Sequence, residues 1–235
     1  KLSSYCAYTI TMVNNNIKKL SHMRQVLCFS ILLCATSCDK QDVSFFPLYA
    51  GLNWQYDIEK QTVIGDFRQR EIINNRGRND SNNDVTFVRA SINGIESHYT
   101  QSSNGIYLKY RSTADGAQVA NNNIASIVFN YPLIVGAEWQ DSLTTSLLKS
   151  YDNRAKDVIE AIPVTVTIES INDVARVPAG KYINCIRILT SGEKYIQRGK
   201  YAYQPDMNIK IVNTRWYAPG VGLVKELQVE SSDVL

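Results

Sequence analysis

The feature that most limits the possible folds of this chain is a succession of short β-rich runs separated by turn signals. Three of these runs lie at 85–91, 95–100 and 106–112. The segments between them contain Asn93-Gly94 and Asn104-Gly105. Asn-Gly is the strongest short signal for a β-hairpin, because both residues tolerate a positive φ. The three runs therefore predict an antiparallel meander.

The rest of the chain continues this pattern. Further runs with the period-two alternation of a strand lie at 54–60, 67–73, 162–170, 181–190, 195–203, 209–217 and 222–230. The polar run 74–84 is predicted to be a long loop, and 143–158 fits a short helix as well as a strand with a loop. The prediction is an all-β domain, a mostly antiparallel curved sheet or half-barrel of about nine or ten strands.

A repeated phrase divides the domain in two. FPLYAGLNWQ at 46–55 and YPLIVGAEWQ at 131–140 share Pro, Leu, Gly, Trp and Gln in one frame. Proline keeps the preceding residue extended, glycine permits a turn with positive φ, and tryptophan supplies a large apolar surface. Each phrase therefore predicts a turn into a strand whose tryptophan packs in the core. Its recurrence predicts two related halves that begin near 46 and 131.

The segment before the first phrase has the pattern of an export signal. The apolar run Val26–Ala35 is too short to span a bilayer and follows basic residues at 18, 19 and 24. Small residues then precede Cys38. Residues 1–37 are therefore predicted to be a signal peptide. Met12 and Met23 are both candidate start residues, so the part before Met23 is a candidate untranslated stretch.

The small residues that end at Cys38 resemble the processing site of bacterial lipoproteins. The resemblance implies cleavage before Cys38 and acylation of that cysteine, although Ala35 stands where the family prefers leucine. Residues 38–44 would then form a lipidated tether and 45–235 a single β domain. Two or three acyl chains hold a protein firmly on a membrane, whereas one binds marginally. The alternative is a plain secretory signal with an incidental cysteine.

Removal of the leader changes the charge and the cysteine count. Of 25 Lys and Arg residues, four precede Cys38, which leaves 21 against 22 Asp and Glu and a net charge near −1. This balance gives no basic footprint for nucleic acid. Apart from Cys38, only Cys185 remains, so no internal disulfide framework is expected.

Three phrases together resemble a family of uncharacterised bacterial lipoproteins, some with a TapB-like domain. They are PLxxGxxW, VPAG at 177–180 and WYAPGVGLVK at 216–225. The resemblance covers about residues 45–230 and implies no reaction or ligand. At the level of fold it is also similar to the half-barrel of LolA-type lipoprotein carriers, a curved sheet with an apolar concave face.

Few residues are candidates for chemistry. His98 is the one histidine after the leader, predicted at a partly exposed strand position, and Cys185 is predicted to be a buried, inert thiol. Neither metal-ligand clusters nor phosphate-binding glycine loops occur in the sequence, so no metal or cofactor is predicted. Carboxylates are scattered over predicted strands and turns: Asp57, Glu59, Glu169, Asp173, Glu193, Glu226 and Glu230.

Tyrosine is unusually frequent, with 14 residues against 6 Phe. The candidate ligand-binding residues are Tyr195, Tyr201, Tyr203 and Tyr217, which would line a groove; packing on half-exposed sheet faces is the alternative. The sequence thus favours a lipid-anchored protein of the bacterial envelope, in the outer membrane. It would bind or support a hydrophobic ligand, a glycan or an envelope protein without catalysis. The alternative is a carboxylate-based hydrolase outside the cytoplasm.

Overall fold

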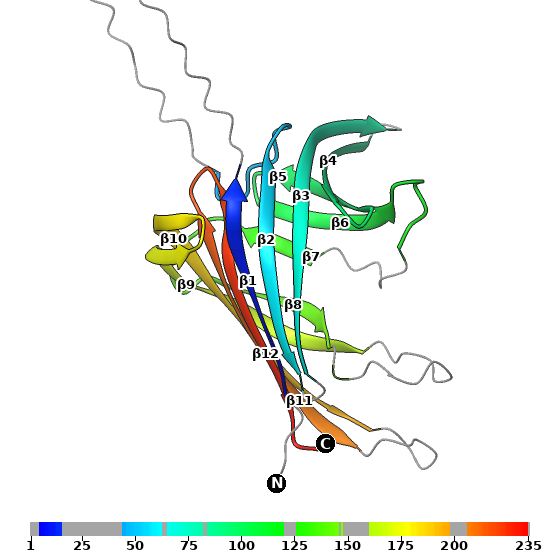
Figure 1. Cartoon of the computed structure of the whole chain (residues 1–235), viewed down its shortest axis with the longest axis vertical. Helices are drawn as coiled ribbons and strands as arrows, with labels where there is room; N and C mark the ends of the chain where they lie inside the picture. The colour runs from blue at the N-terminus through cyan, green and yellow to red at the C-terminus, as the bar shows by residue number, and fades with distance from the viewer. Residues whose placement is uncertain are drawn as a thin grey trace, which may run out of the picture.

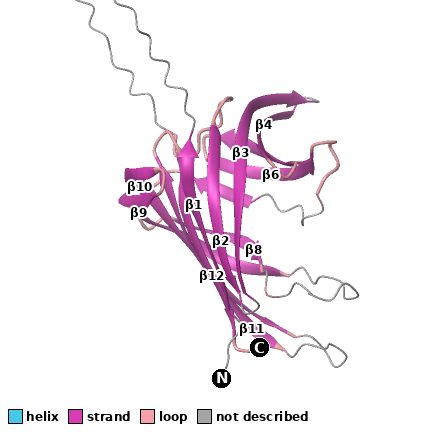
Figure 2. Ribbon diagram, in the orientation of Figure 1, coloured by secondary structure: helices cyan, strands magenta, loops and turns pink. Residues whose placement is uncertain are grey.

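The computed structural model describes residues 5–15, 44–62, 65–81, 84–119, 126–145, 147, 160–197 and 206–234. Within these residues the chain forms 12 strands and no helix (Figure 2). The strands are β1 (Tyr5–Asn15), β2 (Asn53–Thr62), β3 (Gly65–Ser81), β4 (Asp84–Ser91), β5 (Ile95–Ser102), β6 (Gly105–Thr113), β7 (Ser126–Asn130), β8 (Glu138–Thr144), β9 (Ala161–Val177), β10 (Gly180–Ile196), β11 (Met207–Ala218) and β12 (Gly222–Ser232).

The strands form one antiparallel sheet that curls into a nearly closed barrel (Figure 1). Their order is β7-β6-β5-β4-β3-β2-β1-β12-β11-β10-β9-β8. The two end strands, β7 and β8, approach each other without a backbone ladder. The hydroxyl of Ser126 on β7 donates to Asp141 Oδ2 on β8 at 2.7 Å, which bridges this seam.

The all-β, antiparallel class is confirmed, but the sheet is larger and more closed than predicted. The count is 12 strands instead of about nine or ten, and the half-barrel becomes a nearly closed barrel. One reason for the higher count is β7, which lies outside every predicted run. β3 is also longer than predicted, because it runs on to Ser81 through most of the polar stretch taken for a loop. Of the candidate helix at 143–158, residues 143–144 lie in β8, and most of the remainder lies outside the described residues.

β1 is the other reason for the larger sheet. Its residues lie inside the stretch assigned to the leader, and no strand was predicted there. In the structure they pair with β2 on one side and with β12 on the other. The signal peptide at 1–37 stays a prediction, and Cys38 lies outside the described residues.

The predicted meander is confirmed as β4, β5 and β6. Gly94 has φ 83° and Gly105 has φ 154°, whereas Asn93 and Asn104 do not adopt a positive φ. The first turn is therefore a three-residue loop that ends in a left-handed glycine, rather than the two-residue turn with two positive φ angles that Asn-Gly most often makes.

The two repeated phrases build the same local structure. Gly51 has φ 90° and its N–H donates to Asn75 O at 3.0 Å, while Asn75 N–H donates to Leu52 O at 2.9 Å. In the second phrase Gly136 has φ 85° and makes the matching pair of bonds. Its N–H donates to Ile168 O at 2.8 Å, and Ile168 N–H donates to Ala137 O at 3.0 Å.

The tryptophan of each phrase is the second residue of a strand and is buried. Trp54 lies in β2 with 2% of its surface exposed, and Trp139 lies in β8 with 7% exposed. The prediction of a turn that leads into a strand with a core tryptophan is thus confirmed at both sites. Beside the first turn, a Cβ at Gly77 would lie 2.8 Å from Ala50 Cβ, so β3 needs glycine there.

The repeat also marks how the chain divides between the two parts of the sheet. Strands β2–β7 follow one another in sequence and in space, and so do β8–β12. β1 lies between β2 and β12 and joins the two meanders. Two side chains of β2 strengthen the joint: the indole N–H of Trp54 donates to Val221 O at 2.7 Å, and Tyr56 Oη donates to Leu223 O at 3.0 Å.

The core fills the barrel in layers. β9 shows why: Ile162, Val164, Val166 and Ile168 alternate inward and are at most 2% exposed. One apolar cluster gathers around Phe46, Phe129 and Tyr217, and a second around Ile209 and Ile211. A third cluster, around Trp54 and Cys185, lies at the β1–β2–β12 joint.

Replacement of Trp54 by alanine tests the role of this joint. Trp54→Ala is expected to lower the free energy of unfolding by about 3–5 kcal/mol, because a buried indole leaves a cavity. Tyr49→Ala, at the exposed tip of the same phrase, is the control and is expected to change it by less than about 0.5 kcal/mol. Chemical denaturation measures both; a loss below about 1 kcal/mol for Trp54→Ala would contradict this account of the phrase.

Candidate functional site

Polar side chains line the interior of the barrel between the two apolar layers. On β12, Glu226, Gln228 and Glu230 alternate onto the buried face, while Leu227 is 38% exposed on the other. Their direct partners across the sheet are Arg215 and Asn213 of β11 and Tyr8 of β1. We call Tyr8, Asn213, Arg215, Glu226, Gln228 and Glu230 the interior polar cluster.

Two acceptors of the interior polar cluster are each shared by two donors. Tyr8 Oη donates to Gln228 Oε1 at 2.9 Å and to Glu226 Oε1 at 3.2 Å. Asn213 Nδ2 donates to the same two oxygens, at 2.8 Å and 2.6 Å respectively. Burial and the nearby Glu226 carboxylate raise the pKa of Tyr8, so its hydroxyl stays protonated and donates.

The network ends at Glu230, which is 2% exposed. Its two carboxylate oxygens accept from Gln228 Nε2 and from Thr145 Oγ1, both at 2.7 Å. A buried carboxylate is tolerated only when such donors replace its hydration. These two bonds therefore explain how Glu230 is accommodated at a buried position.

Arg215 is the cation of the interior polar cluster. Its Nη2 donates to Thr190 Oγ1 at 3.2 Å, while its Nε is buried and, among the described residues, has no hydrogen-bond partner. The Arg215 side chain is half-buried within the sheet. Burial lowers the pKa of Arg215, but Tyr217 and Glu226 raise it by more. The pKa therefore lies above its ordinary value, and Arg215 stays charged.

Two more polar atoms of the interior share this condition. Asn213 Oδ1 and Trp139 Nε1 are buried without a hydrogen-bond partner in the part of the chain that the structure describes. Trp139, Val166, Thr190 and Asn213 follow one another across β8, β9, β10 and β11 as direct register partners. One wall of the barrel therefore carries two unpaired donors and one unpaired acceptor along neighbouring rows.

Glu71 faces the same interior from β3, where it is the register partner of Tyr56. Burial raises its pKa above the usual range; Arg111 opposes the shift and Glu226 adds to it. A carboxyl group with a raised pKa that interacts with a second carboxylate is the kind of arrangement that general acid catalysis uses.

Arg89 is a second enclosed cation, and it contrasts with Arg215. Its guanidinium lies 3.6 Å from the centroid of the Phe46 ring and 4.8 Å from that of Trp54. Nη2 donates to Pro47 O at 2.8 Å, and Nε donates to Asn75 Oδ1 at 2.9 Å. Arg89 thus fastens the first repeated phrase across one end of the barrel, and its role is structural.

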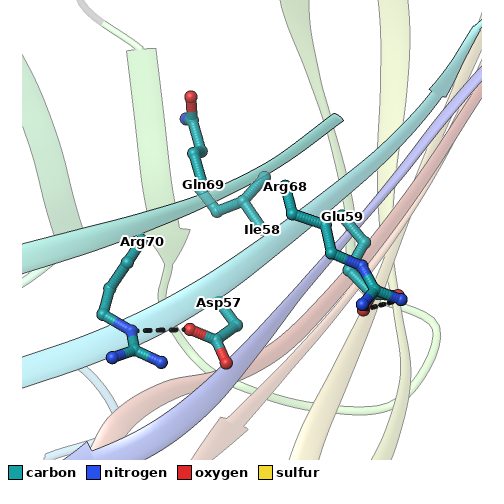
Figure 3. Close-up of a pocket in the computed structure, with 6 residues that line it drawn as sticks. All are labelled: Asp57, Ile58, Glu59, Arg68, Gln69 and Arg70. Atoms are coloured by element: carbon teal, nitrogen blue, oxygen red, sulfur yellow. Dashed lines mark hydrogen bonds and ion pairs between the residues drawn. The ribbon is translucent and has the colours of Figure 1, made fainter. Parts of the chain in front are cut away.

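A surface pocket lies on the β2–β3 hairpin (Figure 3). Its lining residues are Asp57, Ile58, Glu59, Arg68, Gln69 and Arg70. The charges are already paired across the hairpin: Arg70 Nε lies 2.8 Å from Asp57 Oδ1, and Arg68 Nη2 lies 3.2 Å from Glu59 Oε1. Because these pairs are exposed and neutralise each other, the pocket is a weaker candidate than the interior.

Tyr195 and Tyr217, the two candidate tyrosines that the structure describes, do not come together. Tyr217 is buried in the apolar core, with its ring centroid 4.8 Å from that of Phe129, whereas Tyr195 is 62% exposed and donates to Asp206. Tyr201 and Tyr203 lie outside the described residues. The groove of four tyrosines therefore remains a prediction without described geometry.

The two other singled-out residues are buried. Cys185 is fully buried and burial raises the pKa of its thiol, as expected for an inert packing residue. His98 is 5% exposed, so the partly exposed position predicted for it is wrong. Its Nε2 lies 3.1 Å from Ser112 Oγ, and its ring stacks on Tyr110 with 4.2 Å between the ring centroids.

Of the seven scattered carboxylates, Glu226 and Glu230 belong to the interior polar cluster. Asp57, Glu59, Glu169 and Asp173 form ion pairs with arginines. The sequence did not indicate the cluster because GLVKELQVE reads as a strand whose Leu227 and Val229 face inward. The available signal was the spacing of Glu226, Gln228 and Glu230, three polar residues two apart.

Comparisons with protein-family models, with curated proteins and with solved structures find no match for this chain. Within the described ranges, no group of three or more potential metal ligands occurs. The same residues contain no helix with the length and hydropathy to cross a membrane. Any function of the interior polar cluster must therefore be inferred from its geometry.

Replacing Glu71 tests the electrostatics of the interior. A carboxyl group with a raised folded-state pKa stabilises the fold fully below its unfolded pKa, and this contribution is lost as the pH rises through the folded-state value. Glutamine does not ionise, so in Glu71→Gln this loss of stability with rising pH is absent. The free energy of unfolding of Glu71→Gln relative to the native chain is expected to increase between pH 4 and pH 7.

Arg111→Gln is the matched variant, because Arg111 favours the charged form of Glu71. Its loss is expected to make the native stability fall more steeply over the same pH interval. Urea titrations at several pH values measure both variants. Parallel pH profiles for the native chain and Glu71→Gln would show that the pKa of Glu71 is the same in the folded and unfolded states, and would contradict this account.

Proposed function

We propose that this chain is a lipid-anchored protein of the bacterial envelope that acts as a non-catalytic binding module. The proposed location in the envelope rests on the apolar run Val26–Ala35 and on Cys38, which follows small residues. Cleavage before Cys38 and acylation there would hold the domain on the outer membrane, facing the periplasm or the surface. The barrel interior would hold the ligand.

The observation that carries the proposal is the set of unpaired polar atoms in the barrel wall. Arg215 Nε, Trp139 Nε1 and Asn213 Oδ1 are buried without partners among the described residues. Each such group costs about 1–3 kcal/mol when it is left unpaired, so native proteins retain few of them without a role. A ligand with several hydroxyl groups would offer acceptors to the two N–H donors and a donor to Asn213 Oδ1.

The unpaired atoms discriminate between two of the ligand classes that the sequence left open, a glycan and a hydrophobic ligand. A glycan or a similar polyhydroxylated molecule offers donors to Asn213 Oδ1 and acceptors to Arg215. An acyl chain would leave these atoms unpaired and would meet the charges of Glu226 and Arg215. We therefore favour a small polar ligand over a hydrophobic one.

A hydrolase is the second candidate, and Glu71 supports it. Its pKa is raised by burial and by Glu226, and the two carboxyl groups come from β3 and β12 of the same wall. The same ligand class serves both functions, and turnover distinguishes them. A binding module leaves an oligosaccharide intact, whereas a hydrolase releases products and loses this activity in Glu71→Gln.

Loss of the interior cation tests the binding function. The full chain is titrated calorimetrically with a panel of soluble oligosaccharides and, separately, with palmitate. Arg215→Met keeps the side-chain length but removes the donors, and is expected to weaken oligosaccharide binding at least about tenfold. Lys210→Met, an exposed position on the same strand β11, is the control and should bind as the native chain does.

Two results would contradict the polar-ligand proposal. One is tight binding of palmitate with no binding of any oligosaccharide. The other is equal oligosaccharide affinity for Arg215→Met and the native chain. The thermal unfolding midpoint of each variant is measured first, so that a misfolded protein is not taken for a binding defect.

The anchor has its own test. In a bacterial host fed a clickable fatty acid, the native chain is expected to incorporate label and to fractionate with membranes, whereas Cys38→Ala does neither. Cys185→Ala serves as the control for labelling at another thiol and should remain labelled. Absence of label on the native chain would remove the anchor from the proposal.

A further inference from the structure

The tip of the β9–β10 hairpin exposes apolar side chains. The ladder between β10 and β11 begins at Ile186, so the hairpin extends beyond its neighbouring strand. Three of its residues are large, apolar and exposed: Ile171 (38%), Val174 (43%) and Ile183 (57%). Single exposed apolar residues need no explanation, whereas several gathered on one element indicate a contact surface.

The two faces of this tip have different surroundings. Ala175 and Cys185 are at most 2% exposed and pack with Trp54 in one apolar cluster. The residues that alternate with them on the other face are exposed. We call Ile171, Val174, Arg176, Lys181 and Ile183 the hairpin patch.

The hairpin patch carries positive charge. Arg176 and Lys181 are direct register partners, and no acidic residue lies between them in the sequence. Neither takes part in an ion pair within the described ranges. The nearest carboxylates of the hairpin, Glu169 and Asp173, both pair with Arg187 at 2.9 Å and so do not neutralise the patch.

The hairpin patch lies at the end of the barrel where the proposed tether ends. Ser44 is the last tether residue, and its carbonyl oxygen accepts from Gly220 N–H in the β11–β12 turn at 2.9 Å. Just before this turn, Trp216 Nε1 donates to Asp173 Oδ2 of the hairpin at 2.9 Å. Figure 1 shows the β9–β10 hairpin and the β11–β12 turn at the same end.

A tether of this length keeps that end of the barrel near the membrane. Ser44 is six residues after Cys38. An extended chain spans at most about 3.6 Å per residue, so the tether reaches about 20 Å. Acyl groups on Cys38 would lie in the bilayer, which places the lipid surface within this distance of Ser44.

We propose that the hairpin patch docks on the membrane that carries the anchor and binds its anionic phospholipids. Val174 and Ile183 enter the boundary between headgroups and acyl chains, while Arg176 and Lys181 bind phosphate groups. The contact fixes the orientation of the barrel on the membrane. The inference rests on the membrane attachment included in the proposed function and adds the surface that faces the lipid.

The test measures lipid contact at single positions of the full chain. A photoreactive diazirine amino acid replaces Ile183 in one variant and Tyr195 in the control variant. Tyr195 is 62% exposed on the same strand. A rise of about 3.3 Å per residue places it roughly 40 Å along β10 from Ile183. Each purified protein is bound to vesicles of phosphatidylethanolamine and phosphatidylglycerol and irradiated, and mass spectrometry identifies the adduct.

We expect a phospholipid adduct at position 183 and none above background at position 195. Arg176→Gln and Lys181→Gln are each expected to lower the yield at 183 roughly fivefold, because a basic residue near an anionic surface strengthens binding by about that factor. Lys210→Gln, at an exposed position of β11, is the charge control and should leave the yield unchanged. Thermal unfolding midpoints show that each variant is folded.

Equal adduct yields at positions 183 and 195 would overturn the inference. An unchanged yield at 183 in both Arg176→Gln and Lys181→Gln would also overturn it. The same irradiation in living cells tests a different occupant: an adduct with a protein in place of a phospholipid would refute docking on lipid.

The anchor is followed separately in the same cells with a clickable fatty acid. A labelled chain without a lipid adduct at position 183 would contradict the docking surface and leave the proposed anchor intact. An unlabelled chain that forms the adduct on vesicles would remove the anchor and keep the docking surface.

Discussion

Two backbone ladders on a single strand hold this barrel together. Each meander is a run of antiparallel neighbours that the sequence connects directly, but the edges formed by β2 and β12 meet only through β1. Trp54 and Tyr56 reach across the same joint to carbonyl groups of the β11–β12 connection and the start of β12. The closure of the sheet, and with it the existence of an enclosed interior, depends on this joint.

The enclosed interior explains why polar groups occur in such ordered contacts. Inward-pointing polar side chains of β11 and β12 are buried, so Gln228 and Glu230 pair within the wall. Arg89 follows the same rule with aromatic rings and a carbonyl group. Arg215 is different, because its buried Nε has no hydrogen-bond partner among the described residues. This unpaired donor makes Arg215 a candidate for ligand binding, whereas Arg89 is a structural residue.

Much of the fold followed from local patterns. Asn93-Gly94 and the two PLxxGxxW phrases fix turns through backbone conformation, which a sequence shows directly. The candidate site did not follow, because closure of the sheet decides which face of β12 is buried. Leu227 and Val229 resemble an inward face, yet Gln228 and Glu230 occupy it. The strand formed by Tyr5–Asn15 was not predicted because that stretch was assigned to the leader.

The two repeated turns bind their neighbouring strands through equivalent residues, Asn75 in one half and Ile168 in the other. Their side chains differ in consequence. The amide of Asn75 donates to the carbonyl oxygens of Pro47 and Tyr49, whereas Ile168 contributes only apolar packing. The first turn is therefore held by side-chain hydrogen bonds in addition to its backbone pair, whereas the backbone pair of the second turn has no such reinforcement from residue 168.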